Sequence, residues 1–338
     1  MGIKIGVLGA GTWGMALSRL LANKGMDVTV WSAIEKEIET YSRDRVHPNL
    51  PGMVIPESIR FTGDIENVCK EKDLIVFAVP SVFVRATAAK ASPFIPKSQM
   101  IVDVAKGMEE GTLFTMTEVI DDEIGKDRQL RLIALSGPTH AEEVALDLPT
   151  TIVSASKDTE AAKKVQEIFM TPVLRVYTNS DIKGVELCGA MKNVMALAAG
   201  ISNGLGNGDN TKAAIITRGM AEITRLGLAM GCAKETFAGL AGIGDLIVTA
   251  TSQHSRNNRC GMLLGQGVGA EEAKARIGMV VEGINALPAA MELSKKYSVD
   301  LPIARGVNAI VNEGADPKKV MKELMGRDAK PEFFWAQG

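Results

Sequence analysis

The chain has few of the cysteines and histidines that form metal sites and disulfide frameworks, and it has no excess of positive charge. Its 338 residues include 4 cysteines and 3 histidines. The cysteines form no Cys-x-x-Cys pair and the histidines are dispersed, which favours reduced thiols and speaks against a metal site. Lys and Arg number 38 against 40 Asp and Glu, for a formal charge of -2. This balance provides no broad positive field for nucleic acid or an anionic membrane.

Long uncharged hydrophobic runs are also lacking. The most apolar helical stretch, residues 185–201, contains Glu186 and Lys192, so we do not expect it to span a membrane. A strand begins at Ile3, which leaves no room for a signal peptide. We therefore expect a soluble, cytoplasmic protein.

Length and pattern predict two domains, because one hydrophobic core rarely keeps growing at this size. In the first half, short runs rich in Val and Ile alternate with helical patterns, which is typical of parallel strands covered by helices on both faces. The predicted strands are 3–8, 27–31, 74–79, 100–104 and 130–135. Strands 151–155 and 174–177, with a helix at 159–169 between them, should extend the same sheet in a mixed arrangement.

From about residue 181 the strand patterns nearly vanish. The predicted helices are 183–201, 212–226, 273–277, 283–296 and 317–324, and Pro302 suits a helix start. We therefore expect an α/β fold, with a Rossmann doubly wound sheet in residues 1–180 and an all-α helical substrate domain in residues 181–338. The C-terminal tail, with Phe333, Phe334 and Trp335, carries no clear structural signal.

A glycine pattern marks the first turn of the predicted sheet. Residues 9–14, Gly-Ala-Gly-Thr-Trp-Gly, fit GxGxxG between a strand and a helix at 15–23. Gly9 permits the tight turn, Gly11 lets the backbone approach a pyrophosphate, and Gly14 lets the helix pack on the strand. The alternative is a glycine-rich turn of another α/β protein. The flanking strand and helix favour a dinucleotide site.

The choice between NAD and NADP stays open at this stage. NAD enzymes commonly end the second strand with an acidic residue, and NADP enzymes place a basic residue nearby. Here the strand ends Val-Trp-Ser-Ala at residues 30–33, with neither. Ser32 can bond to either form of the ribose, and Arg43 and Arg45 lie farther along the chain.

Ligands of open α/β sheets lie beyond the carboxyl ends of the strands. The residues in those positions are 80–81, 106–107 and 136–139. Lys106 is the charged one among them. Lysines are usually solvated at the surface, and the position at a strand end makes substrate contact an equally good interpretation.

Lys192 and Asn193 interrupt an almost wholly apolar helix at residues 184–200. A helix that is apolar all round is buried, and a buried ammonium group is costly unless it is paired or loses its proton. Lys192 is thus a candidate acid–base group. A lysine that reaches the helix surface is the alternative of equal weight. Asp245, set between glycines and an aliphatic run, is a candidate partner for Lys192.

Hydroxyl, guanidinium and amide side chains gather at residues 249–258, just before a helix predicted at 259–264. Together with the N–H groups of a helix N-terminus they can form a phosphate site. An ordinary polar loop with a Ser or Asn helix cap is the alternative.

Together these motifs resemble the bacterial-type NAD(P)-dependent glycerol-3-phosphate dehydrogenases, from Ile3 to about Met325. The motifs that carry the resemblance are 9–14 with Trp13, 50–52, 78–81, 106–107, 136–144, 184–200, 204–206, 212–227, 239–245 and 255–259. The resemblance implies hydride exchange between sn-glycerol 3-phosphate and dihydroxyacetone phosphate, which feeds phospholipid synthesis, usually by a cytoplasmic homodimer. Lys192 and Arg256 belong to one predicted domain and the dinucleotide to the other, so we expect the site in the cleft between the domains, with closure during turnover.

The glycine motif, the mechanism expected for Lys192 and the resemblance together give three sets of site residues, and the resemblance makes Lys192 the proton acceptor. The catalytic set is Lys106, Lys192, Asp245 and Thr249. The substrate contacts are Lys106, Gly137, Thr139, Lys192, Asp245, Ser255, Arg256 and Asn257. The dinucleotide contacts are Gly9, Gly11, Thr12, Trp13, Gly14, Lys106, Ala141, Arg256, Val280 and Glu282. The chain departs from the family at Ala33, where relatives often carry His or Arg, so the usual NADP preference does not carry over.

Two other functions fit part of the pattern. A hydroxy-acid dehydrogenase of similar two-domain build also uses a lysine on a long helix, although a phosphate site at Ser255–Asn257 suits it less well. A dinucleotide-binding sensor without turnover would need neither Lys192 nor Asp245.

Overall fold

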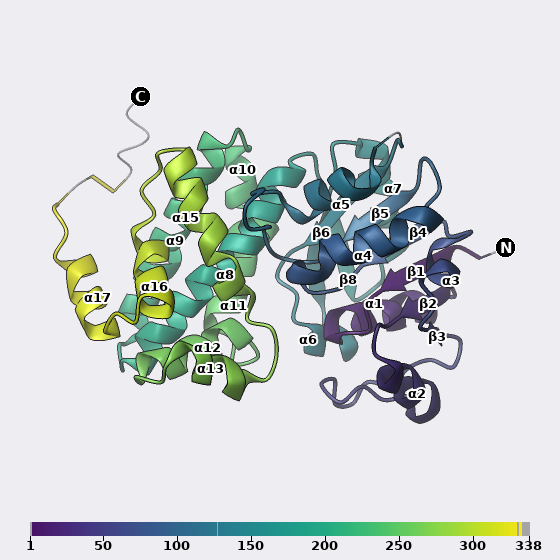
Figure 1. Ribbon diagram of the computed structural model, residues 1–338, viewed down its shortest axis with the longest axis horizontal. Helices are drawn as coiled ribbons and strands as arrows, with labels where there is room; N and C mark the ends of the chain where they lie inside the picture. The colour runs from purple at the N-terminus through teal and green to yellow at the C-terminus, as the bar shows by residue number, and fades with distance from the viewer. Residues whose placement is uncertain (1, 127, 330, 333–338) are drawn as a thin grey trace. The chain divides into compact units, whose positions relative to one another are not determined.

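The computed structural model describes residues 2–126, 128–329 and 331–332 (Figure 1). The chain divides into two compact units. Unit 1 comprises Met1–Glu109 and Phe114–Glu186, and unit 2 comprises Glu110–Leu113 and Leu187–Gly338. The division falls inside helix α8 (Ile182–Gly204). The tail residues Phe333, Phe334 and Trp335 lie outside the described residues.

An eight-stranded sheet forms the centre of unit 1, in the order β3-β2-β1-β4-β5-β6-β7-β8. Its strands are β1 (Lys4–Leu8), β2 (Asp27–Trp31), β3 (Arg60–Thr62), β4 (Leu74–Phe77), β5 (Met100–Asp103), β6 (Arg131–Ser136), β7 (Thr150–Ala155) and β8 (Leu174–Asn179). Every neighbouring pair is parallel except β6 and β7. The predicted doubly wound sheet and its mixed extension are confirmed.

Helices cover both faces of this sheet. They are α1 (Thr12–Asn23), α2 (Glu35–Asp44), α3 (Ile65–Cys69), α4 (Val84–Ala91), α5 (Met116–Ile124), α6 (Ala141–Ala145) and α7 (Thr159–Phe169). Alternate strand residues enter two separate hydrophobic clusters, as the two-residue period of a strand requires. On β4, Val76 packs with the cluster that contains α1 and α7, while Phe77 packs with the one that contains α4 and α5.

Strand β3 was not predicted. It has three residues, and none of them is buried. It pairs with β2 alone, at the edge of the sheet. A strand so short and so exposed has no hydrophobic alternation from which a sequence pattern could identify it.

The described residues of unit 2 contain no β-strand, which confirms the predicted all-α domain. Its helices after α8 are α9 (Asp209–Ala229), α10 (Lys234–Phe237), α11 (Asp245–Thr251), α12 (Arg256–Gly265), α13 (Ala270–Ile277), α14 (Glu282–Asn285), α15 (Leu287–Lys296), α16 (Pro302–Asn312) and α17 (Pro317–Met325). The prediction of one helix over 283–296 was wrong, because the helix breaks at Ala286. Pro288 cannot donate the backbone hydrogen bond that a continuous helix needs at that point, and it suits the first turn of α15 instead.

Helix α8 is long and apolar enough to cross a membrane, yet its most apolar window is completely buried within the protein. Glycines let the backbone of α12 lie directly against it. A Cβ atom on Gly200 would lie 2.1 Å from the carbonyl oxygen of Asn258, and one on Gly261 would lie 2.3 Å from that of Leu197. No side chain fits at these contacts, so they fix where α12 begins relative to the middle of α8.

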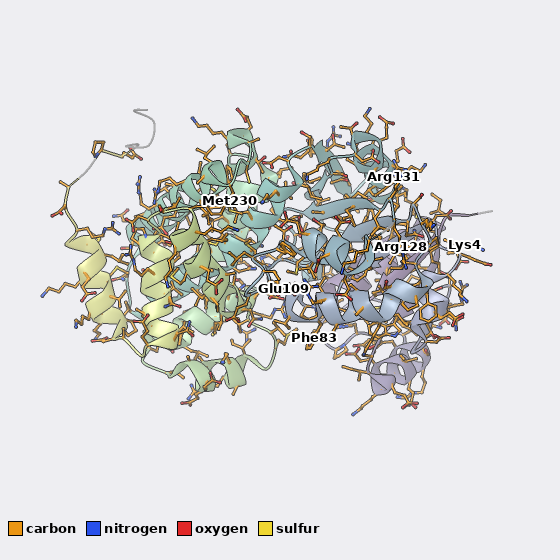
Figure 2. All side chains as sticks on the ribbon, turned by 45° about the horizontal axis from the view of Figure 1, so that its top comes forward. Lys4, Phe83, Glu109, Arg128, Arg131 and Met230 are labelled. Atoms are coloured by element: carbon orange, nitrogen blue, oxygen red, sulfur yellow. The ribbon has the colours of Figure 1, made fainter. Side chains whose placement is uncertain are left out.

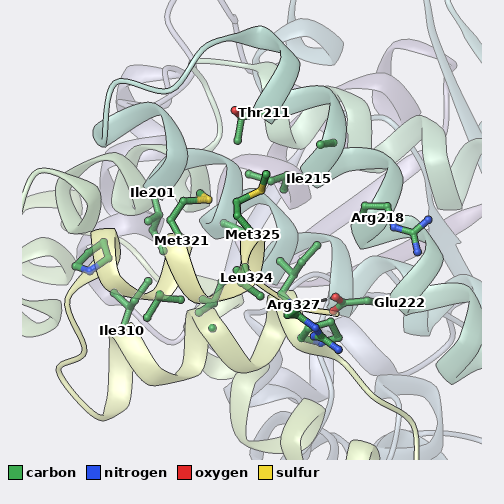
Figure 3. A pocket seen from close by; sticks show the side chains of 18 of the residues that line it. Ile201, Thr211, Ile215, Arg218, Glu222, Ile310, Met321, Leu324, Met325 and Arg327 are labelled. Atoms are coloured by element: carbon green, nitrogen blue, oxygen red, sulfur yellow. Dashed lines mark hydrogen bonds between the residues drawn. The ribbon is translucent and has the colours of Figure 1, made fainter. Parts of the chain in front are cut away.

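A cavity of about 380 Å³ lies in unit 2, bordered by the end of α8 and by α9, α16 and α17 (Figure 3). Ile215, Ile310 and Met321 are among the mostly apolar side chains that line it. Helices α16 and α17, green-yellow and yellow in Figure 1, pack on each other. None of the predicted site residues lines this cavity.

Glu222 is a buried carboxyl group at the edge of this cavity. It accepts hydrogen bonds from the backbone N–H groups of Ile303 (2.8 Å) and Ala304 (3.3 Å), in the first turn of α16. Burial raises the pKa of Glu222 to about 7, against the opposing effect of these two hydrogen bonds. The folded chain therefore holds a proton at Glu222 between about pH 4.5 and 7, where the unfolded chain has released it.

Because the folded state holds this proton and the unfolded state does not, the free energy of unfolding falls as the pH rises through that window. A glutamine at position 222 does not titrate and therefore removes this pH dependence. We predict that the free energy of unfolding of the wild type, minus that of Glu222→Gln, decreases by on the order of 3 kcal/mol between pH 5 and pH 8. Urea unfolding across this range measures the difference, with the exposed Glu235→Gln as the control substitution. A difference that is constant with pH would contradict the prediction.

Candidate active site

Lys192 lies in the middle of α8 and is 5% exposed. Its Nζ donates a hydrogen bond to Asp245 Oδ1 and another, of 2.8 Å, to Thr249 Oγ1. Asp245 and Thr249 are one turn apart on α11, so both side chains face Lys192. The predicted pairing with Asp245 is present, and the alternative of a lysine that reaches the surface was wrong.

The start of α11 explains how an acidic side chain comes to be wholly buried. Asp245 is 0% exposed and is the first residue of the helix, where the helix dipole favours a negative charge. It follows a π-helical turn at Leu240–Gly244. In that turn Gly242 has non-helical dihedral angles, and a Cβ atom there would lie 2.2 Å from the carbonyl oxygen of Phe237. Glycine at position 242 thus lets the chain pass close to the Phe237 backbone and place the Asp245 carboxylate against α8.

Thr249 completes this cluster. Its hydroxyl donates to the backbone carbonyl of Asp245 at 2.6 Å. A hydroxyl that has donated its one hydrogen can act only as an acceptor toward the Lys192 amine. The amine is thus held by two oxygens on one helix. This geometry orients the Nζ lone pair or proton and fits an acid–base group.

A chain of amides joins α8 to two other helices of unit 2. Asn257 on α12 donates through Nδ2 to Asn193 Oδ1 at 2.9 Å, and its Oδ1 accepts from the backbone N–H of Gly283 on α14 at 2.9 Å. Asn193 in turn donates to the Gly189 carbonyl at 3.1 Å. The sequence indicated Asn193 by its polarity within an apolar helix but gave no sign of this role. Contact of Asn257 with substrate stays a prediction.

Helix α12 begins at Arg256, three residues before the predicted start at 259, because Ser255 is its N-cap. The Ser255 hydroxyl accepts from the Asn258 N–H at 3.2 Å. The alternative of a Ser cap is therefore correct for Ser255. Arg256, half-buried, stands in the first turn of α12. A guanidinium at the positively polarised end of a helix favours an anion.

In unit 1 the glycine turn has the geometry that a dinucleotide needs. Gly9 has φ 122°, and a Cβ atom there would lie 2.6 Å from the carbonyl oxygen of Ala78; one on Gly14 would lie 2.4 Å from that of Gly9. A Cβ on Gly11 would meet nothing within 4 Å. The protein's own packing therefore requires glycine at positions 9 and 14, whereas at Gly11 the open space fits a ligand that approaches the backbone.

The N-terminus of α1 is available at the same turn. Gly11 is the N-cap, so no side chain caps the helix, and its first turn has no acidic residue. The Trp13 Nε1 is buried without a hydrogen-bond partner in the part of the chain that the structure describes. Thr12 begins the helix. These N–H groups and this helix end fit a pyrophosphate.

Lys106, Gly137 and Thr139 come together beyond β5 and β6. The Lys106 Nζ donates to the Gly137 carbonyl at 3.0 Å, and the Thr139 hydroxyl donates to the same oxygen at 3.1 Å. Ala141 follows as the first residue of α6. The predicted site residues of unit 1 thus lie beyond the carboxyl ends of parallel strands, at the same edge of the sheet as the glycine turn.

An ion cluster secures the segment after Lys106. Arg85 on α4 donates twice to Glu109 at 2.7 Å, and to Asp122 on α5 at 2.7 Å. Glu109 is labelled in Figure 2.

The remaining predicted dinucleotide contacts lie at the start of α14 in unit 2. Glu282 is the first residue of this helix, and Val280 lies two residues before it. The next N–H along the helix, that of Gly283, donates to Asn257.

Comparison with protein families decides the classification. The N-terminal family model of NAD-dependent glycerol-3-phosphate dehydrogenase matches residues 4–162, and the C-terminal one matches residues 181–322. The chain belongs to the NAD-dependent glycerol-3-phosphate dehydrogenase family. The predicted resemblance is confirmed, and with it the oxidoreductase class.

Relatives of this dehydrogenase family match the chain over nearly its whole length. Glycerol-3-phosphate dehydrogenase [NAD(P)+] 2 of Lactobacillus delbrueckii subsp. bulgaricus is 62% identical, over 98% of this chain and 99% of the relative. The enzyme named glycerol-3-phosphate dehydrogenase [NAD(P)+] from Agathobacter rectalis is 51% identical, over 97% of each chain. The crystal structure of glycerol-3-phosphate dehydrogenase from Coxiella burnetii superposes with a TM-score of 0.92 at 37% identity, covering 96% of this chain and 99% of that one.

The buried pair in this dehydrogenase predicts a specific pattern of stability. Lys192→Met leaves the Asp245 carboxylate without its partner charge, and Asp245→Leu leaves the Lys192 ammonium without its own. Each substitution should lower the free energy of unfolding by about 3–5 kcal/mol. The decrease in the double variant should be smaller than the sum of the two single decreases by at least about 2 kcal/mol. Urea unfolding of the four proteins measures this coupling, and strictly additive losses would show that the two groups do not depend on each other.

Proposed function

We propose that this chain exchanges hydride between sn-glycerol 3-phosphate and dihydroxyacetone phosphate with NAD(H) or NADP(H). The observation that carries the proposal is the buried Lys192 amine, held by Asp245 and Thr249. Family membership and the names of the relatives support the choice of substrate and cofactor.

When bound, the nicotinamide ring supplies or accepts the hydride. In the oxidative direction, Lys192 takes the proton of the substrate's secondary hydroxyl. In the reductive direction, the Lys192 ammonium donates a hydrogen bond to the carbonyl oxygen and then gives it the proton. Asp245 and Thr249 keep the Nζ oriented in both directions. Lys106 adds positive potential near the oxygen on which charge develops.

The substrate phosphate is assigned to Arg256 and the N-terminus of α12. A fixed phosphate limits where the reacting carbon can lie, and such positioning can lower a barrier by several kcal/mol. Ser255, Asn257, Gly137 and Thr139 are proposed to contact the substrate as well. Gly9, Gly11, Thr12, Trp13, Gly14, Ala141, Val280 and Glu282 are proposed to contact the dinucleotide.

The family also supports three wider proposals. The chain would supply glycerol phosphate for phospholipid synthesis, act in the cytoplasm and form a homodimer. In the same proposal, residues 1–180 form the dinucleotide-binding domain with the glycine turn, and residues 181–338 form the substrate domain with Lys192 and Arg256.

The two alternative functions have less support. Structures such as D-mandelate dehydrogenase (TM-score 0.63, 14% identity) share the fold alone, whereas the relatives named for glycerol 3-phosphate reach 62% identity. A sensor without turnover has no need for a lysine buried between a carboxylate and a hydroxyl. An assay that follows NADH and NADPH oxidation with dihydroxyacetone phosphate, and with a 2-oxo acid in parallel, distinguishes all three. Oxidation with the 2-oxo acid alone would contradict the proposal.

We predict that Lys192→Ala lowers kcat by roughly two to four orders of magnitude, the usual contribution of general acid–base catalysis. Because Lys192 is not among the proposed dinucleotide contacts, the variant should bind the dinucleotide as the wild type does. Steady-state kinetics and a fluorescence titration with NADH measure the two quantities. A variant with nearly full turnover would remove Lys192 from the mechanism.

Arg256→Ala is expected to act mainly on substrate capture. Loss of a charge-assisted contact to phosphate should raise the KM for dihydroxyacetone phosphate by about 10- to 100-fold. Arg259→Ala, an exposed arginine on the same helix, is the matched control. If both variants keep the wild-type dependence on substrate concentration, Arg256 does not hold the phosphate.

A further inference from the structure

The fold brings an acidic side chain to the end of β2 that the sequence pattern did not reveal. Ser32 directly follows the strand, and its hydroxyl donates to Glu37 Oε2 at 2.6 Å. The same hydroxyl accepts from the Ile34 N–H at 3.1 Å. Glu37 lies in the first turn of α2 and is half-buried. The chain turns back after Ser32, so a carboxylate five residues farther on comes to the strand's carboxyl end.

Strand pairing and a backbone hydrogen bond place the end of β2 beside the glycine turn. The Gly9 N–H donates to the Trp31 carbonyl at 3.0 Å, and Leu8 pairs with Trp31 across β1 and β2. Ser32 is the next residue. In dinucleotide-binding Rossmann folds, the adenosine ribose lies at this point, beyond the end of the second strand. An acidic side chain here accepts a hydrogen bond from the ribose 2′-hydroxyl, and a basic one accommodates a 2′-phosphate.

The two arginines that follow β2, Arg43 and Arg45, are bonded elsewhere. Arg43 donates through Nε and Nη2 to its neighbour Asp44. Arg45 donates through Nη1 to the carbonyls of Pro56 and Ile59, and its Nε pairs with Glu57. Lys36 precedes Glu37 on α2, so it projects about 100° away around the helix. The first turn of α2 contains Glu35 in addition to Glu37, so negative charge dominates this end of the helix.

We propose that the Ser32–Glu37 pair makes this chain prefer NAD(H) to NADP(H). Glu37 accepts the 2′-hydroxyl of the ribose and repels a 2′-phosphate, whose charges would lie within a few ångströms of the carboxylate. Ser32 holds the carboxylate in place as a positioning residue. Ile34, 55% exposed between them, offers an apolar surface beside the ribose. The proposal rests on the proposed function only in that the glycine turn binds a nicotinamide dinucleotide.

Fluorescence titrations of the full-length protein with NADH and with NADPH test this proposal through binding alone. The wild type should bind NADH at least about tenfold tighter than NADPH. Glu37→Gln removes the charge and should reduce that ratio about tenfold, chiefly because NADPH binds more tightly. Raising the salt concentration screens the repulsion between Glu37 and the 2′-phosphate. It should therefore reduce the NADH to NADPH affinity ratio of the wild type and leave that ratio unchanged in Glu37→Gln.

Two further variants separate a specific role from a structural one. Glu39→Gln neutralises an exposed carboxylate on the same helix and should leave the NADH to NADPH ratio unchanged. Ser32→Ala releases Glu37 and should weaken NADH binding while the thermal unfolding temperature stays close to that of the wild type.

The outcomes distinguish this proposal from the proposed function. A wild type that binds NADPH as tightly as NADH, or a ratio that Glu37→Gln does not change, would overturn the preference while leaving the dehydrogenase activity open to the assay above. Failure to bind either dinucleotide would overturn both. A preserved preference for NADH, with no oxidation in the presence of dihydroxyacetone phosphate, would overturn the proposed function alone.

Discussion

Burying the Lys192 ammonium inside an apolar helix costs free energy, and the partner charge of Asp245 offsets that cost. This constraint accounts for much of the local structure of unit 2. Asp245 begins a helix, where the helix dipole favours its charge. The preceding turn must contain glycine at position 242, because a side chain there would collide with the backbone of Phe237. Thr249 lies one turn later, where its oxygen accepts a hydrogen bond from the same amine.

The helices around this pair are fixed by contacts that allow little variation. Gly200 and Gly261 let the backbones of α8 and α12 touch, which sets the distance from Lys192 to the start of α12. Asn257 then ties α12 to α8 through Asn193 and to α14 through the Gly283 N–H. The proposed acid–base group, the proposed phosphate arginine and the start of α14 are therefore held in one rigid arrangement. Such preorganisation is what transition-state stabilisation requires.

The sequence predicted well what depends on local pattern. Strands buried on both faces are runs of Val and Ile, and the roles of Gly9 and Gly14 follow from the backbone geometry of a tight turn. Lys192 and Asp245 could be paired from the sequence, because each is a charge among apolar residues. Features that depend on tertiary contacts were predicted less well. The edge strand β3 has no buried residue, and the start of α12 depends on the Ser255 hydroxyl reaching the Asn258 N–H. Glu37 lies five residues from Ser32, so only the turn into α2 shows that they meet.

Chemical rescue of a Lys192→Ala variant tests the central claim most directly. If the primary amine held by Asp245 and Thr249 moves the proton, small alkylamines added to the variant should enter the space left by the side chain and restore turnover. The restored rate should rise with amine concentration and, across a series of amines of similar size, should vary with amine pKa. A variant that folds and binds dinucleotide, but whose rate no amine changes, would contradict the account.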